Sequence, residues 1–309
     1  MRIWDKIKNR ILWIFDRQWD YKYLNNCFRK SRKESINTIC IGSSYTAFGI
    51  NSWKTCINMA LPSQDIYYTT ELIKKYLDSS SGISNIIIGM GYYSLYSDLS
   101  RTKSVDENDR IYDVYFPILQ DLHNMPDTIF NETVVRYGRL NKLIRLIINL
   151  TFFPGFPKNY FNKVSHTRNR RGIKSWRDSS LKWNELSDDE RYKVAHSRVM
   201  AHEKQFKYSG SERENRRILC ELSKICKDKN INLYTYISPM TNEYLSAMSD
   251  YYVCKKKELC AFLEKISDGF IDFNVEEFIF ERHDFVDSDH LGDSGANKLS
   301  AYIIKVFDI

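Results

Sequence analysis

The chain has 309 residues, of which 43% are hydrophobic and 14% aromatic, and this composition excludes an intrinsically disordered protein. Its formal net charge of +7 favours an anionic substrate or membrane surface, but it is too small and too spread out to indicate nucleic acid as a partner. The seven cysteines lack CxxC spacing, which indicates reduced thiols in a cytoplasmic protein rather than a disulfide framework or a zinc site.

Apolar residues recur at helical spacing over residues 1–15 (MRIWDKIKNRILWIF), with Lys6, Lys8 and Arg10 between them. We interpret residues 1–35 as an N-terminal amphipathic helical segment. Two interpretations of its role stay open: a helix packed on the domain, or an interfacial helix at the acidic inner face of a membrane. The sequence has no signal-peptide pattern, and no stretch reaches the ~18 consecutive apolar residues that a membrane-spanning helix requires.

Short apolar runs alternate with helical stretches through the rest of the chain. Continuous apolar runs of this kind are typical of parallel strands that are buried on both faces. The alternation therefore predicts a flavodoxin-like, three-layer α/β/α domain over residues 36–309 with a central parallel sheet. The expected strands cover residues 37–42, 55–60, 85–91, 231–240 and 269–273, and the expected helices cover residues 63–78, 214–230, 244–266 and 293–306.

Residues 100–213 do not fit this alternation, and we interpret them as a helical insertion, or lid, between the third and fourth strands. Open α/β sheets bind ligands at the carboxyl ends of their strands, and the insertion is expected over that edge. It contains a basic tract at residues 166–177 (HTRNRRGIKSWR). The tract is either a solvated loop or a contact for an anionic part of the substrate, through Arg170 and Arg171.

The sequence CIGSSYTAFGI, residues 40–50, places Ser43 and Ser44 at the end of the first expected strand. A serine in a tight turn at this place points its hydroxyl out of the carboxyl edge of the sheet. The helix that follows offers backbone N–H groups to a developing oxyanion. A nucleophilic serine also needs an adjacent base, and without one the two serines are an ordinary helix N-cap.

A candidate base follows the last expected strand, in the sequence FVDSDHLGDSGANK. Asp287 lies three residues before His290, a spacing that lets its carboxylate bind the far ring nitrogen and fix the tautomer. The same sequence resembles a calcium loop, but Leu291 and Lys298 stand where oxygen ligands are required, so no metal is expected. Because Ser44 also follows a strand, both segments are expected at one edge of the sheet.

Together these two segments resemble the SGNH (GDSL-like) hydrolase superfamily, in a divergent branch associated with surface-polysaccharide modification. Residues 42–44 (GSS) correspond to the block that carries the nucleophile, and residues 287–290 (DSDH) correspond to the C-terminal Asp-x-x-His block. The resemblance implies that Ser44 is the nucleophile, His290 its base and Asp287 the acid that orients the histidine. It covers the α/β core and not the insertion.

Two other blocks depart from the superfamily pattern. Ala60 stands where a glycine normally supplies an oxyanion N–H, so the resemblance implies an oxyanion hole formed by the N–H groups of Ser44 and Ala60. The block that normally supplies an Asn side chain has none in IIIGMGYYS. Tyr92, Tyr93 and Ser94 are the candidates to replace it or to bind substrate.

The resemblance implies a serine-dependent O-acyltransferase or esterase that acts through an acyl-enzyme and uses no cofactor. Its partners would be an acyl donor and a carbohydrate acceptor, a cell-surface glycan or its precursor. We favour transfer over hydrolysis because a basic insertion over the site can bind a phosphorylated donor and exclude water. Two alternatives stay open: a catalytically degenerate glycan-binding or scaffold protein, and a transferase that binds a nucleotide-activated donor at residues 86–91 (IIIGMG).

Overall fold

The computed structural model describes residues 20–30, 35–80, 82–102, 105–125 and 183–309. The chain divides into two compact units, residues 1–26 with 99–166 and residues 27–98 with 167–309. The predicted insertion is therefore shared between the two units. Its last part belongs to the unit that contains the sheet. The predicted helix over residues 1–15 lies outside the described residues.

In the first unit the described residues form short helices. Arg110 is almost fully buried, and its guanidinium contacts the Asp20 carboxylate at 2.8 Å. This ion pair joins the helical residues 20–26 to the next segment of the same unit. That segment consists of η2 (Leu99–Arg101), α4 (Val105–Arg110), the π-helix η3 (Ile111–Tyr115) and α5 (Phe116–Leu119).

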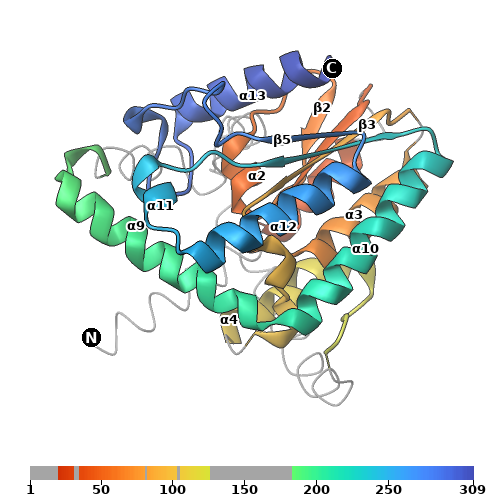
Figure 1. The fold of residues 1–309 in the computed structure, drawn as a ribbon. Coiled ribbons are helices and arrows are strands. Elements are labelled where there is room, and N and C mark those ends of the chain that lie inside the picture. Colours follow the sequence, from red (N-terminus) through yellow and green to blue (C-terminus); the bar gives the residue numbers. More distant parts are fainter. Residues whose placement is uncertain (1–19, 31–34, 81, 103–104, 126–182) are drawn as a thin grey trace, which may run out of the picture. The chain divides into compact units, whose positions relative to one another are not determined.

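Five parallel strands form the sheet of the second unit, in the order β2-β1-β3-β4-β5 (Figure 1). This order is the one found in flavodoxin-like folds, and the strand order reverses between β1 and β3. The predicted three-layer α/β/α fold is thereby confirmed. The strands are β1 (Thr38–Gly42), β2 (Cys56–Asn58), β3 (Asn85–Met90), β4 (Asn232–Ile237) and β5 (Gly269–Asp272).

Helices cover both faces of this sheet (Figure 1). On one face lie α2 (Ser44–Gly49) and α13 (Asp293–Phe307), and on the other lie α3 (Ile66–Ser79), α10 (Ser209–Asp228) and α12 (Asp250–Ile266). Two further helices, α9 (Asp188–Glu203) and α11 (Asn242–Ser246), contact each other near the carboxyl ends of the strands.

Two helix boundaries differ from the prediction. The expected helix over residues 244–266 is interrupted, because Ser249 starts α12 as an N-cap whose side chain accepts a hydrogen bond from the Tyr252 N–H. Thr241 caps α11 in the same way. In addition, α10 begins at Ser209, inside the predicted insertion.

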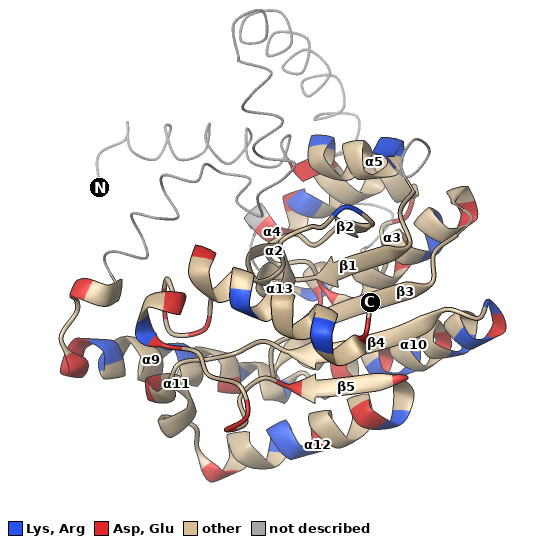
Figure 2. Ribbon diagram, turned by 90° about the horizontal axis from the view of Figure 1, so that it is seen from above, with Lys and Arg blue, Asp and Glu red and all other residues tan. Residues whose placement is uncertain are grey.

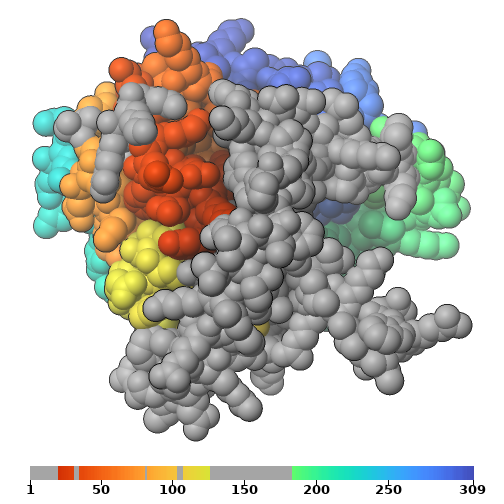
Figure 3. Space-filling model, turned by 180° about the vertical axis from the view of Figure 1, so that it is seen from behind, coloured from red at the N-terminus to blue at the C-terminus, as the bar shows by residue number. Residues whose placement is uncertain are grey.

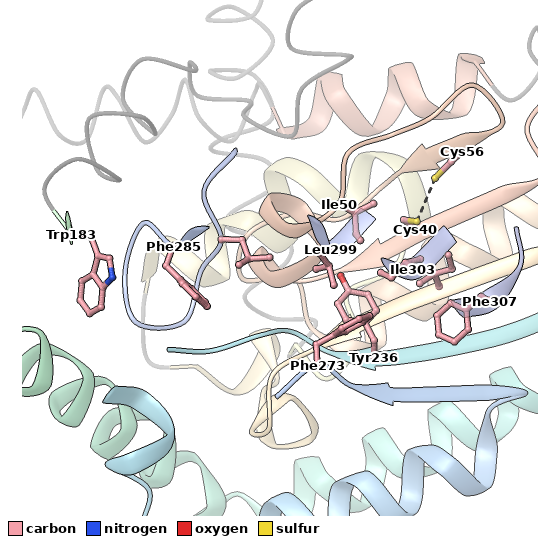
Figure 4. Packing of buried hydrophobic residues seen from close by; sticks show 12 residues of the cluster. Cys40, Ile50, Cys56, Trp183, Tyr236, Phe273, Phe285, Leu299, Ile303 and Phe307 are labelled. Carbon is pink, nitrogen blue, oxygen red and sulfur yellow. Dashed lines mark hydrogen bonds between the residues drawn. The ribbon is translucent and has the colours of Figure 1, made fainter. Parts of the chain in front are cut away.

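The core between the sheet and α13 is largely aromatic and aliphatic (Figure 4). Both β1 and β3 are buried along their whole length, which explains their continuous apolar sequences. On neighbouring strands the thiols of Cys40 and Cys56 lie 3.4 Å apart, and burial raises the pKa of Cys40 well above its ordinary value. The core residues are Cys40, Ile50, Cys56, Ile87, Trp183, Tyr236, Phe273, Phe285, Leu291, Leu299, Ile303 and Phe307.

Charged residues of both signs occur along α9, α10 and α12 (Figure 2). Within the described residues, no helix combines the length and the apolar character that crossing a membrane demands.

Candidate active site

Two glycines allow β1 to pass close to β3 and then turn into α2. Gly42 has a φ of +142°, which L side chains rarely adopt, and a Cβ there would lie 2.5 Å from the carbonyl oxygen of Gly89. Ser43 follows as the N-cap residue, and its carbonyl oxygen accepts a hydrogen bond from the Ala47 N–H at 2.9 Å. Ser44 is therefore the first residue of α2, at the carboxyl end of β1.

The far end of α2 is held by Asn58, a buried residue at the end of β2. Its Nδ2 donates to the carbonyl oxygens of Thr46 at 2.9 Å and Ile50 at 3.0 Å, while its Oδ1 accepts from the Ala60 N–H at 3.0 Å. The Ala60 N–H is thus engaged inside the protein. Its predicted role in an oxyanion hole is contradicted, because the amide of Asn58 is already its acceptor.

The segment after α2 is also bound to the C-terminal helix. The Asn51 N–H donates to the Ser300 hydroxyl at 2.9 Å, and the Asn51 side chain donates to the side-chain oxygen of Asn297. Figure 3 shows these parts of the chain, orange and dark blue, sharing the upper surface in that view. The helix that carries Ser44 is therefore fixed by β2 and by α13.

The structure brings Ser44, His290 and Asp287 together at this edge of the sheet, as predicted. The Ser44 Oγ lies 2.9 Å from Nε2 of His290, although the two residues are 246 positions apart in the chain. On the other side of the ring, Nδ1 of His290 lies 3.1 and 2.9 Å from the two carboxylate oxygens of Asp287. This is the hydrogen-bonding pattern of a nucleophile, a base and a group that orients the base.

The histidine and its carboxylate change each other's proton affinity. Burial would raise the pKa of Asp287, but the adjacent His290 and the Asp289 N–H lower it to about 2, so the carboxylate is charged. Burial lowers the pKa of His290, yet the carboxylates of Asp287 and Asp289 together raise it above its ordinary value. The imidazole is consequently a stronger base than an isolated histidine.

A second carboxylate, that of Asp289, lies next to this triad and is 1% exposed. It accepts hydrogen bonds from the Tyr45 hydroxyl at 2.9 Å and from Nε of Arg198 at 3.0 and 3.2 Å. Sequence reasoning did not assign a role to any of these three residues. The DSDH motif showed a second acidic residue, but nothing in the insertion sequence singled out Arg198.

Of the predicted substrate-binding residues, Tyr93 is the one that lies beside this cluster. Its ring stacks on that of His202, with 3.9 Å between the ring centroids. Burial lowers the pKa of His202 to about 3, so this imidazole is neutral at physiological pH. Nδ1 of His202 lies 2.6 Å from the Tyr244 hydroxyl, which in turn lies 2.7 Å from the hydroxyl of Tyr252.

The other candidate substrate-binding residues have structural roles or lie elsewhere. Tyr92 is fully buried, and its hydroxyl lies 2.9 Å from both carboxylate oxygens of Asp272. The Ser94 hydroxyl accepts a hydrogen bond at 2.9 Å from a backbone N–H at the end of β3. The full burial of Tyr92 contradicts a substrate-binding role for it, whereas the role of the half-buried Ser94 stays a prediction. Arg170 and Arg171 lie outside the described residues.

The glycines of IIIGMG accommodate neighbouring aromatic side chains. A Cβ at Gly89 would lie 2.2 Å from the Tyr236 ring, and one at Gly91 would lie 2.4 Å from the Tyr45 ring. These rings occupy the space that a phosphate group would need to approach the backbone. The packing therefore does not favour a nucleotide-activated donor at this turn.

The donor atoms of Asp287, Asp289 and His290 lie within 4.8 Å of one another, close enough to share a cation. Arg198 already provides a positive charge on Asp289, and His290 directs its second nitrogen at Ser44. These contacts favour proton transfer over metal binding.

Comparison with known proteins finds no family model that matches the chain and no curated protein that matches it.

Proposed function

We propose that the chain is a serine-dependent O-acyltransferase or esterase that acts on a carbohydrate through an acyl-enzyme. The observation that carries this proposal is the continuous hydrogen-bonded series from the Ser44 hydroxyl through His290 to the Asp287 carboxylate. Its place at the carboxyl edge of the sheet also supports the proposal, because ligands of open α/β sheets bind there. The carbohydrate and the superfamily come from the resemblance of the GSS and DSDH motifs.

In the first half of the reaction, the Ser44 Oγ attacks the carbonyl carbon of an ester or thioester while its proton passes to Nε2 of His290. The negative charge that develops on the carbonyl oxygen faces the N–H of Ser44 at the start of α2. The bond to the leaving group then breaks, and that group takes the proton from His290. An acyl-serine remains.

In the second half, an acceptor hydroxyl gives its proton to His290 and attacks the acyl-serine. The Ser44 oxygen leaves and recovers its proton from the imidazolium. A sugar hydroxyl as acceptor makes the protein an O-acyltransferase, and water makes it an esterase. Asp287 stays ionised throughout and stabilises the imidazolium that forms in each half.

A non-catalytic glycan-binding protein is the second candidate, and one observation favours it. The Ala60 N–H is bound to Asn58, so the second oxyanion donor of the superfamily pattern is absent from its expected place. Loss of one such donor typically costs about 10²–10³ in rate. This candidate predicts that Ser44 is unreactive and that substitution of Ser44 leaves glycan binding intact.

The deciding experiment is intact-mass analysis after incubation with a fluorophosphonate, which labels activated serines. We expect one label per wild-type molecule, and no label on Ser44→Ala or His290→Ala. Ser43→Ala is the matched control, because it removes the neighbouring hydroxyl and keeps the triad, and it is expected to label fully. An unlabelled but folded wild type would contradict the enzymatic proposal and favour the glycan-binding candidate.

We propose a cytoplasmic location, with two roles open for the N-terminal residues: packing on the domain, or contact with the inner face of a membrane. The support for this is the amphipathic, lysine-containing pattern of residues 1–15 and the scattered cysteines. Sedimentation with vesicles that contain anionic lipid tests it, with vesicles of neutral lipid as the comparison. If the protein sediments with neither type of vesicle, the membrane contact is removed from the proposal.

A further inference from the structure

The ring of Tyr45 lies parallel to the ring of His290. The two centroids are 5.3 Å apart and the planes differ by 16°, while the Tyr45 hydroxyl donates to Asp289 at 2.9 Å. Behind the tyrosine lies Gly91, where any side chain would occupy the space that the Tyr45 ring fills. Because the far end of Tyr45 is bound to a buried carboxylate, the tyrosine is a fixed surface for the imidazole.

Asp289 is itself held from several directions. Arg198 reaches it from α9, the Ser288 hydroxyl donates to it at 3.3 Å, and its carboxylate lies 3.8 Å from Nδ1 of His290. Arg198 is 40% exposed, whereas Asp289 is 1% exposed. The helix that supplies the arginine belongs to the part of the chain predicted as an insertion.

We propose that Asp289 is a positioning residue for the triad, which holds the imidazole of His290 through Tyr45 and whose charge is balanced by Arg198. This inference rests on the proposed function, since it assigns a task within the same site. It makes α9 part of the catalytic apparatus: the helix supplies the cation that lets a second carboxylate remain buried next to the first.

Charged groups reach the imidazole from two elements. The segment of His290 itself supplies Asp287 and Asp289, and α9 supplies Arg198. The other titratable groups nearby are neutral at physiological pH, because burial lowers the pKa of His202 and raises the pKa values of Tyr45 and Tyr93. Burial, two negative charges and one positive charge therefore set the proton affinity of His290.

Opposite charges must act in opposite directions on that proton affinity. The Asp289 carboxylate raises the pKa of His290, and the Arg198 guanidinium lowers it. Asp289→Asn is therefore expected to lower the pKa of His290, and Arg198→Gln to raise it. If Asp289 and Arg198 only maintained packing, the two substitutions would not shift the pKa of His290 in opposite directions.

The test combines two measurements on the full-length chain. The pKa of His290 is followed by NMR of histidine-labelled protein, assigned with His290→Ala, in wild type, Asp289→Asn and Arg198→Gln. The rate of fluorophosphonate labelling is measured against pH in wild type, Tyr45→Phe and Tyr252→Phe. Tyr252→Phe is the matched control, because it also removes one buried, hydrogen-bonded hydroxyl but does not contact the triad.

We expect pKa shifts of opposite sign in the two charge variants. We also expect Tyr45→Phe to label at least about tenfold more slowly at every pH, since small displacements of a catalytic group have large effects on rate. Tyr252→Phe should label like wild type. Normal labelling of Tyr45→Phe, or shifts of the same sign in both charge variants, would overturn the inference.

The two readouts separate this inference from the proposed function. If the wild type is never labelled, the enzymatic proposal is removed, and opposite pKa shifts in the two charge variants would still show that Asp289 and Arg198 act on His290. If Asp289→Asn does not fold, the upward shift in Arg198→Gln and the slow labelling of Tyr45→Phe decide the matter.

Discussion

At the scale of single residues, the site differs from a simple triad in the number of groups around its histidine. His290 contacts a serine through one ring nitrogen and an aspartate through the other, with a second aspartate close to the same nitrogen. A neutral imidazole, that of His202, lies on the far side of Asp289, 4.0 Å away. Both histidines therefore lie close to the Asp289 carboxylate, yet the pKa of His202 is lowered and that of His290 is raised.

The buried neutral His202 makes a prediction about stability. Its pKa is about 3 in the folded protein and about 6.5 in an unfolded chain. As pH falls from about 6.5 towards about 3, the unfolded state binds a proton that the folded state does not, so the free energy of unfolding decreases. Denaturant unfolding at several pH values should show this decrease, and His202→Gln should weaken it.

His196, which lies exposed on the same helix, offers the control. His196→Gln removes an exposed histidine from the same helix and leaves His202 in place, so it is the matched control. If His202→Gln and His196→Gln show the same pH dependence, the acid sensitivity of the protein arises elsewhere.

At the scale of elements, α2 has six residues and cannot hold its position by itself. Its start is fixed by the close approach of β1 and β3 at two glycines, and its end by the Asn58 amide. The position of Ser44 therefore depends on Asn58, a residue of the next strand.

Asn58→Ala is expected to destabilise the protein and slow the labelling of Ser44. The substitution removes the side-chain donor of the Ile50 carbonyl oxygen, one of the two donors of the Thr46 carbonyl oxygen, and the side-chain acceptor of the Ala60 N–H. Loss of the partner of a buried polar group costs about 1–3 kcal/mol. Denaturant unfolding measures the loss in stability. Asn51→Ala, which removes a more exposed asparagine contact, is the matched control and should cost less.

The sequence predicted most of these elements, and the failures share a cause. The strands and the triad were predicted because apolar runs and the GSS and DSDH motifs are local patterns. The misassigned donors Ala60 and Tyr92 failed because their partners, Asn58 and Asp272, had not been considered. The Asn58 contact spans two residues and is a familiar asparagine turn, so it could have been found, whereas the contact between Arg198 and Asp289 joins distant segments and leaves no local signal.

At the scale of the whole molecule, the site is assembled from segments that are far apart in the chain. β3 pairs with β4 across a separation of 147 residues, and the Ser44 hydroxyl meets its base across 246. Non-local pairing of this kind makes parallel sheets slow to form. The candidate site is complete once both long-range connections have formed.

This order of assembly predicts that serine reactivity is a late event in refolding. Short pulses of fluorophosphonate during refolding from denaturant should label Ser44 only after most of the helical circular dichroism has returned. Labelling that recovers together with the earliest helical signal would mean that the serine and histidine segments meet before the sheet is complete. Helical circular dichroism is the appropriate comparison for the labelling, because helices form faster than non-local strand pairs.

The two edge strands of the sheet have a consequence for how molecules meet each other. β2 contains three residues and β5 four, so each edge offers few backbone groups to a strand from another chain. Short edge strands are one of the means by which proteins avoid joining their sheets edge to edge. The molecule can therefore reach high local concentration, as at a crowded surface, with little tendency to self-associate through its sheet.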